Sequence, residues 1–293
     1  MKAAAFDFVQ PSSIDEACRH LARTSDDPQI IAGGQSLMPM MAMRLVRPGL
    51  IVDINKIEAL SGIAERDDSV TIGACTRQAD AETSPIVRTQ LPLLKKALRF
   101  VGHDQTRNRG TIGGSLAHAD PSAEICLTAI ALGANITLTS AKGKRDLTAA
   151  EFILGPMTTA IEDDEILTAV SLPVWTGEDR IGAGFQEVSS RQSDFAIVAA
   201  AAQISIDADG TCRRAVVAVA NATPAPIRLT ALEDGLVGHE PTAAIIDPHL
   251  ESLNTVLEPE ADLHASGTAR IHIAKSLIRR AILEAAEDAK AND

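Results

Sequence analysis

Apolar and polar positions in residues 1–176 alternate between helical and strand-like periods. In residues 11–22 the apolar side chains recur every three or four positions behind Ser13, a residue type that caps helices, so we expect a helix there. The same reasoning predicts strands at residues 29–32, 50–54, 70–73, 135–139 and 165–172, helices at 37–45 and 124–132, a helical region in two pieces at 79–98, a loop at 102–114 and a turn at 141–145.

Beyond residues 176–179 the pattern changes to longer strands, predicted at 199–207 and 212–220. The sequence Ala-Asp-Gly at 208–210 is a hairpin signal between them, and residues 269–289 form an amphipathic helical tail. We therefore expect an α+β protein with a boundary at this point. The expected domains are residues 1–176, with subdomains of about 1–56 and 57–176, and residues 177–293.

Composition narrows the class of protein. Hydrophobic residues make up 45% and charged residues 23% of the 293 residues, which is ordinary for a globular chain. The formal net charge of −12 gives no support for nucleic-acid binding, and no apolar run is long enough to span a bilayer. The four cysteines lie far apart without the spacing of a zinc or iron–sulfur site, so we expect thiols in the cytoplasm.

Two glycine pairs carry the candidate chemistry. Gly33-Gly34 lies between a predicted strand and a predicted helix, where free backbone N–H groups could hold a phosphate and Ser36 adds a hydroxyl. A tight strand–helix turn alone would also explain one such pair. Gly113-Gly114, with Thr111 and Ser115 beside it, repeats the arrangement, and two loops favour a bound diphosphate.

Other site types fit less well. Neither loop matches the dinucleotide fingerprint or the P-loop. His103, His118, Asp120 and Glu124 form an alternative, a metal cluster, although Asp120 and the proline after it equally suit a helix-start turn.

Residues 32–41 (Ala-Gly-Gly-Gln-Ser-Leu-Met-Pro-Met-Met) and residues 107–124, which contain Arg-Gly-Thr-Ile-Gly-Gly-Ser-Leu-Ala-His, resemble the FAD-binding medium subunit of aerobic carbon monoxide dehydrogenases and xanthine dehydrogenase-type molybdenum hydroxylases. Residues 185–196 resemble a third motif of that family, and the similarity spans the whole chain. The resemblance implies a vanillyl-alcohol-oxidase-like (PCMH-type) FAD-binding domain of two α/β subdomains, followed by a C-terminal α+β domain.

The resemblance also implies the cofactor site, and it assigns no catalytic residue and no metal ligand to this chain. FAD would lie extended in a cleft between domains. The residues implied to line it are Ile31, Ala32, Gly33, Gly34, Gln35, Ser36 and Leu37 at the pyrophosphate, Val101, Gly102, Thr111, Gly113, Gly114 and Ser115 completing the dinucleotide site, Ala117 and Glu124 flanking the ribityl–adenosine portion, and Ile166, Leu167, Gln186 and Phe195 near the isoalloxazine.

The function implied is electron transfer within a larger complex. A small subunit with [2Fe–2S] clusters and a large subunit with molybdopterin would be the partners, in a dimer of heterotrimers, and electrons would pass through FAD to an external acceptor. The substrate, discriminated in the large subunit, and the acceptor are left open by this sequence. Two alternatives remain: a freestanding FAD-dependent oxidase or reductase, and a scaffold module that has lost its flavin.

Overall fold

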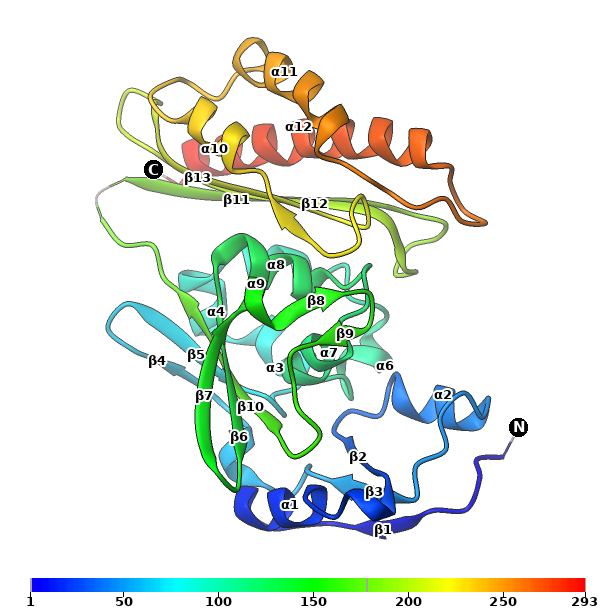
Figure 1. The fold of residues 1–293 in the computed structure, drawn as a ribbon. Coiled ribbons are helices and arrows are strands. Elements are labelled where there is room, and N and C mark those ends of the chain that lie inside the picture. Colours follow the sequence, from blue (N-terminus) through cyan, green and yellow to red (C-terminus); the bar gives the residue numbers. More distant parts are fainter. Residues whose placement is uncertain (1, 178, 293) are drawn as a thin grey trace.

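A computed structural model describes residues 2–177 and 179–292, and within them it shows three sheets of three to five strands with their helices, and a two-stranded sheet, β8-β9 (Figure 1). The first sheet is parallel, in the order β1-β3-β2, and it carries two helices. Its elements are β1 (Asp7–Val9), α1 (Ile14–Leu21), β2 (Pro28–Ile31), α2 (Leu37–Ala42) and β3 (Leu50–Asp53). Ser13 caps α1 by accepting a hydrogen bond from the Glu16 N–H, as expected.

The second sheet has the order β4-β5-β10-β6-β7, with all neighbouring strands antiparallel. Its strands are β4 (Ile63–Glu65), β5 (Ser69–Gly73), β6 (Asn135–Ser140), β7 (Gly143–Thr148) and β10 (Ile166–Pro173). The associated elements are α3 (Gln78–Thr83), α4 (Pro85–Gln90), α5 (Pro92–Leu98), α6 (Asp104–Arg107), α7 (Ile112–His118), α8 (Glu124–Leu132), α9 (Ala149–Phe152), β8 (Ile153–Gly155) and β9 (Thr158–Thr159). Helix α8 is buried at every position, so it lies within the core.

The third sheet is antiparallel in the order β11-β12-β13-β14. Its elements are β11 (Arg180–Ser189), β12 (Ala196–Ile206), β13 (Cys212–Ala220), β14 (Ile227–Arg228), α10 (Thr230–Leu236), α11 (Ala243–Ser252) and α12 (Gly267–Ala291). Both faces of β12 are covered: Ala199 and Ala201 join the core shared with α5 and α8, whereas Ala200 and Ala202 pack toward α12. Alanines suit this position because small side chains let layers approach on both sides.

Helix α12 lies against β11 and also closes its free edge. A Cβ on Gly184 would lie 2.0 Å from the Ala281 carbonyl oxygen, so only glycine permits this approach. The carboxylates of Glu284 and Asp288 accept hydrogen bonds from backbone N–H groups of β11, at 3.1 and 2.9 Å. Lys96 on α5 pairs with both carboxylates and donates to a β11 carbonyl oxygen at 2.6 Å. These contacts connect the third sheet to a helix that is associated with the second sheet.

The expected α+β class is confirmed, but several predicted elements were wrong in detail. The helical region at 79–98 has three helices, because Ser84 and Leu91 leave the helical conformation before prolines. The predicted turn at 141–145 includes the start of β7, the predicted loop at 102–114 contains α6 and the start of α7, and α2 ends at residue 42 instead of 45. Strand β11 was not predicted. The predicted boundary at 176–179 includes Glu178, which lies outside the described residues.

Within the described residues, no helix combines the length and the apolar character needed to cross a bilayer.

Candidate functional site

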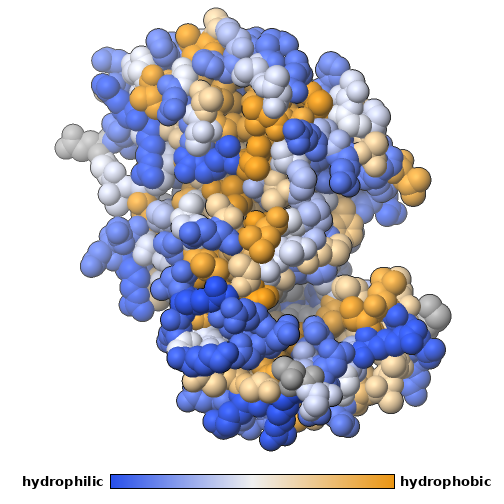
Figure 2. Space-filling model, viewed as in Figure 1, coloured by the Kyte–Doolittle hydropathy of each residue, from blue (hydrophilic) through white to orange (hydrophobic). Residues whose placement is uncertain are grey.

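A cavity of about 750 Å³ opens between the lobe that carries α2 and the rest of the molecule, where the surface in Figure 2 is hollowed. It is bounded by β2, the loop after it, α2, α7, the α7–α8 turn, the start of β10 and the β11–β12 loop. Its volume falls in the range of small-molecule and cofactor sites. The cavity is the candidate site, and we refer to it as the cleft.

The loop between β2 and α2, residues 32–36, presents unpaired backbone donors to the cleft. The N–H groups of Gly33, Gly34, Gln35, Ser36 and Leu37 donate to no other described residue. Gly34 has φ +72°, a conformation that glycine adopts at no steric cost. Successive free N–H groups at a helix start attract anions, so this loop can hold a diphosphate.

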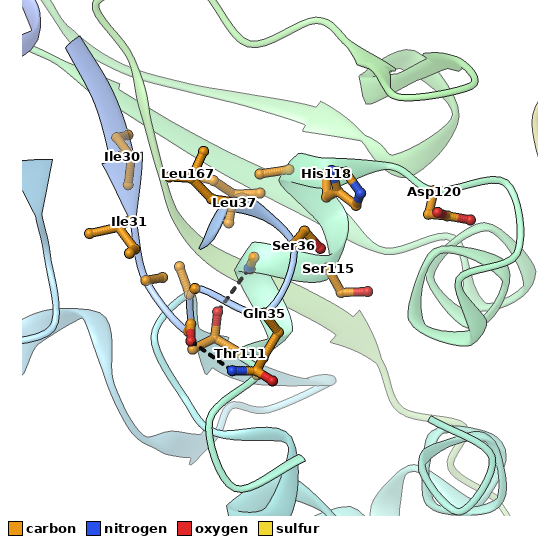
Figure 3. A pocket seen from close by; sticks show the side chains of 18 of the residues that line it. Ile30, Ile31, Gln35, Ser36, Leu37, Thr111, Ser115, His118, Asp120 and Leu167 are labelled. Carbon is orange, nitrogen blue, oxygen red and sulfur yellow. Dashed lines mark hydrogen bonds between the residues drawn. The ribbon is translucent and has the colours of Figure 1, made fainter. Parts of the chain in front are cut away.

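The loop that precedes α7 has a different structure from the first one. Its cap residue Thr111 accepts a hydrogen bond from the Gly114 N–H at 3.0 Å, and the N–H groups of residues 112, 113 and 115 bond to backbone oxygens. Gly113 permits close packing instead, since a Cβ there would lie 2.5 Å from the Ala74 side chain. The second loop therefore contributes shape and the Ser115 hydroxyl, which lines the cleft together with Ser36 of the first loop (Figure 3).

The two loops are packed directly against each other. A Cβ on Gly33 would lie 2.3 Å from the Arg109 carbonyl oxygen and 2.9 Å from the Gly110 Cα. Both contacts are with backbone, so neither neighbour can rotate away. Gly33 is thus required for the contact between the loops, a role that the sequence alone had assigned to clearance for a phosphate.

Arg77 and Asn55 stabilise the contact between the two loops by hydrogen bonds to the backbone of each loop. The Arg77 guanidinium donates to the Arg109 carbonyl oxygen at 2.6 Å and to the Asn55 side-chain oxygen at 2.7 Å. Asn55 in turn donates to the Ala32 carbonyl oxygen at 2.7 Å. One cation therefore connects both loops, although neither residue was a candidate from the sequence.

A buried carboxyl group lines the cleft at the start of α8. Glu124 is only 9% exposed, and burial, followed by the charge of Asp120, raises the pKa of its carboxyl group to about 7. The turn before it is held against the C-terminal domain, because the Ser122 hydroxyl donates to the Ala196 carbonyl oxygen at 2.9 Å and accepts from Asn221 at 3.1 Å. The position of this carboxyl group thus depends on both domains.

The C-terminal domain reaches the cleft through the loop between β11 and β12. Ser193, Asp194 and Phe195 line the cleft, and the Phe195 side chain is 73% exposed. Asp194 accepts from the Phe195 N–H and pairs with Arg191, and these contacts lower the pKa of its carboxyl group. The Phe195 ring therefore lies at the cleft with much of its surface uncovered, where it can cover a planar ligand.

Most of the site residues predicted from the sequence lie together in the cleft. Residues 31–37, 101, 102, 111, 113–115, 117, 124, 166, 167 and 195 all line it. Gln186 does not line it, because its side-chain amide donates to Glu284 at 2.9 Å on the α12 side of the sheet. Lining residues that the sequence had not indicated as part of a flavin site include Gln78, His118, Asp120 and Asp194.

The alternative metal cluster gains no support. Across residues 2–177 and 179–292, no three His, Cys, Asp or Glu side chains gather closely enough to hold a metal ion.

Comparisons with known proteins agree on one family. Residues 4–175 match the family described as the FAD binding domain in molybdopterin dehydrogenase, and residues 183–285 match the CO dehydrogenase flavoprotein C-terminal domain. The chain is 36% identical over 290 residues to the 6-hydroxypseudooxynicotine dehydrogenase complex subunit alpha of Paenarthrobacter nicotinovorans, covering 99% of this chain and 97% of that protein.

Solved structures give the same result. A chain of quinoline 2-oxidoreductase from Pseudomonas putida 86 superposes with a TM-score of 0.92 at 36% identity, covering 99% of both chains. A chain of reconstituted CO dehydrogenase from Oligotropha carboxidovorans superposes with a TM-score of 0.94 at 30% identity, covering 98% of this chain and 100% of that one.

The residues of the cleft fit the cofactor of this family. The unpaired N–H groups of residues 33–37 match the chemistry of a diphosphate, and the apolar side chains of Ile30, Ile31 and Leu167 supply a wall on the strand side (Figure 3). The two matched regions together span most of the chain. The chain therefore belongs to the FAD-binding flavoprotein subunits of the molybdopterin dehydrogenases, which are oxidoreductases.

Proposed function

We propose that this chain relays electrons through FAD between an iron–sulfur subunit and an external acceptor, in a complex whose large subunit carries molybdopterin. Two relatives, one named as subunit alpha of a dehydrogenase complex and one as the medium subunit of nicotine 6-hydroxylase, support the assembly. FAD supplies the redox chemistry, since it exchanges electrons singly or in pairs. The four cysteines, all free and buried, support a reducing compartment, so we place the complex in the cytoplasm.

The observation that carries the site assignment is the row of unpaired N–H groups in residues 33–37. In our proposal these donors hold the FAD diphosphate. Thr111, Ser115, Val101, Gly102 and Ala117 then shape the neighbouring wall.

The other end of the flavin is assigned to the region where the domains meet. Ile166 and Leu167 at the start of β10 offer an apolar surface, and Phe195 reaches across from the C-terminal domain. The proposed division is residues 1–176 for the FAD-binding domain, with subdomains of about 1–56 and 57–176, and residues 177–293 for the C-terminal domain. Gln186 has no place in this site, since its side chain points to α12.

The diphosphate assignment is tested by placing a negative charge in the first loop. Ser36 is the N-cap residue of α2 and its side chain makes no capping hydrogen bond. Aspartate is a favourable N-cap residue, so Ser36→Asp should keep the fold, while its charge should repel the diphosphate. The asparagine side chain in Ser36→Asn has nearly the same shape as aspartate but carries no charge, so this variant is the matched control.

We expect the affinity for FAD, measured by flavin fluorescence on the full chain, to be at least about tenfold weaker in Ser36→Asp than in Ser36→Asn. Equal affinities would place the diphosphate elsewhere. Oxidation of an organic substrate by the isolated FAD-loaded chain would favour a freestanding oxidase instead of a relay subunit.

A further inference from the structure

One buried amide in the wall of the cleft has no hydrogen-bond partner. Gln78, the first residue of α3, lines the cleft and is only 6% exposed. Its side-chain Oε1 is buried without a partner, and no hydrogen bond joins its Nε2 to any residue in 2–177 or 179–292. Buried polar groups are normally paired, because leaving one unpaired costs free energy. Since Gln78 lines the cleft, a group bound there can supply the missing partner.

The backbone of Gln78 is held against the second glycine loop. Residues 76–78 run antiparallel to residues 110–112 through an isolated β-bridge. The Gln78 N–H donates to the Gly110 carbonyl oxygen at 2.9 Å, and a second backbone hydrogen bond joins the two segments at 3.0 Å. The second loop therefore sets the position from which the Gln78 side chain extends.

Gly110 leaves the space that the Gln78 carboxamide occupies. A Cβ on Gly110 would lie 2.4 Å from the Gln78 Oε1 and 2.8 Å from its Cδ, so only a hydrogen atom fits there. The same glycine meets the first loop, since a Cβ on Gly33 would lie 2.9 Å from the Gly110 Cα. Gly110 thus contacts both the carboxamide and the loop whose N–H groups we propose to hold the diphosphate.

The chemistry of the amide indicates which part of a ligand it can meet. The free N–H groups of the first loop are donors, and they suit the oxygens of a diphosphate. A carboxamide offers an acceptor as well as donors, and its acceptor is satisfied only by a ligand group that donates. FAD carries such groups on both sides of the diphosphate, as hydroxyls of the ribityl chain and of the ribose. A hydroxyl both donates and accepts, so it matches either end of the carboxamide.

We propose that Gln78 binds a sugar hydroxyl of FAD next to the diphosphate, and that Gly110 positions the carboxamide by leaving room for it. Gln78 is thus a binding residue, and Gly110 is a positioning residue that acts through it. The inference rests on the proposed FAD site. It adds recognition of the sugar part of the cofactor to the recognition of the diphosphate by the first loop.

Replacing the amide with an apolar side chain of similar length tests this role. In Gln78→Met we expect the Kd for FAD, measured by flavin fluorescence titration on the full chain, to rise about 2- to 10-fold, the loss expected for one neutral hydrogen bond. We expect the Tm of the flavin-free variant to be unchanged or higher, because the substitution removes a buried polar group that has no partner.

The two readouts separate a binding role from a structural one. An unchanged Kd would overturn the inference and leave the proposed function intact, whereas a wild-type chain that binds no FAD would overturn both. A lower Tm together with a weaker affinity would also overturn the inference, because Gln78 would then stabilise the fold rather than contact the ligand.

Gln203→Met is the matched control. Gln203 on β12 is 3% exposed, its Oε1 also lacks a partner among the described residues, and it does not line the cleft. The same substitution at this position should leave the Kd for FAD at the wild-type value. An equal rise in Kd in the two variants would overturn the inference, because the effect would not depend on the cleft.

FMN and ADP distinguish the two possible sources of the hydroxyl. FMN contains the ribityl chain without the ribose, and ADP contains the ribose and the diphosphate without the ribityl chain. Gln78→Met should bind one of these two ligands more weakly than the wild type does, as measured by displacement of bound FAD, and that ligand identifies the hydroxyl. If the variant and the wild type bind both ligands equally well, the assignment to a sugar hydroxyl is wrong.

A double-mutant cycle tests the role of Gly110. Gly110→Ala should weaken FAD binding in the wild-type chain, because the added methyl group displaces the Gln78 carboxamide. The three atoms nearest to that methyl group all belong to the Gln78 side chain, so Gly110→Ala should have a smaller effect on the Kd in a Gln78→Ala background. The same fold-change in both backgrounds would overturn the positioning role.

Discussion

The contact between the two glycine loops leads to a quantitative prediction for Gly33→Ala. The added Cβ would lie 2.3 Å from a backbone oxygen of the second loop, whereas ordinary contacts begin at about 3.4 Å. The loops must therefore move apart by roughly 1 Å. Since only backbone is involved, no side chain can relieve the contact, and overpacking of this kind costs about 1–3 kcal/mol.

The proposed diphosphate donors lie on one of these loops, so the displacement should weaken FAD binding. If the whole cost falls on the binding-competent arrangement, the Kd for FAD rises about 5- to 150-fold. Flavin fluorescence titration measures the Kd, and thermal unfolding in the absence of FAD measures the cost to the fold.

The control for this prediction is Gly155→Ala. A Cβ on Gly155 would meet no atom within 4 Å, and this residue does not line the cleft. We expect an FAD affinity close to that of the wild type for it. The reasoning is refuted if Gly33→Ala binds FAD as tightly as Gly155→Ala does.

Three further predictions follow from other contacts. Arg77→Ala removes the cation that joins both loops, so it should weaken FAD binding by about tenfold in the same fluorescence titration. Arg77→Lys cannot make both contacts at once, so its affinity for FAD should lie between those of Arg77→Ala and the wild type. Backbone N–H groups and Arg270 lower the pKa of Asp262 to about 2. The ionised carboxylate therefore stabilises the fold above its ordinary pKa, and this contribution is lost as the pH falls toward 2. Asp262→Asn should lower Tm at neutral pH, and its difference in Tm from the wild type should shrink in acid. Gly184→Ala places a Cβ against the Ala281 carbonyl oxygen, so it should lower Tm and reduce the free energy of unfolding by about 1–3 kcal/mol. Its affinity for FAD should change little, because Gly184 does not line the cleft.

Local signals were sufficient for much of the fold. The cap at Ser13, the continuous apolar run of α8 and the turn before Cys212 each depend on neighbours in sequence, and the structure confirms the elements that they predicted. Strand β11 was missed because Gly182, Ala183 and Gly184 have low strand propensity, and the two glycines are needed where α12 approaches the strand.

In the candidate site, too, the features that depend on neighbours in sequence were predicted, and those that depend on distant residues were not. Glycine pairs revealed both loops, but the sequence could not show that the N–H groups of one loop are free and those of the other are already paired. Arg77 has its two partners 22 and 32 residues away, so no local pattern identifies it. The face of β11 that a side chain occupies depends on the parity of the strand, and this parity places Gln186 beside Glu284 of α12, away from the cleft.

The acidic side chains of α12 that bond to β11 have a consequence for how the complex can assemble. An open strand edge is a template to which another chain can add by backbone pairing, and this includes unwanted copies of the same protein. Glu284 and Asp288 occupy N–H groups along that edge, and Lys96 occupies a carbonyl oxygen. Partner subunits at β11 must therefore recognise side chains rather than extend the sheet, which protects the chain from edge-to-edge aggregation before it meets its partners.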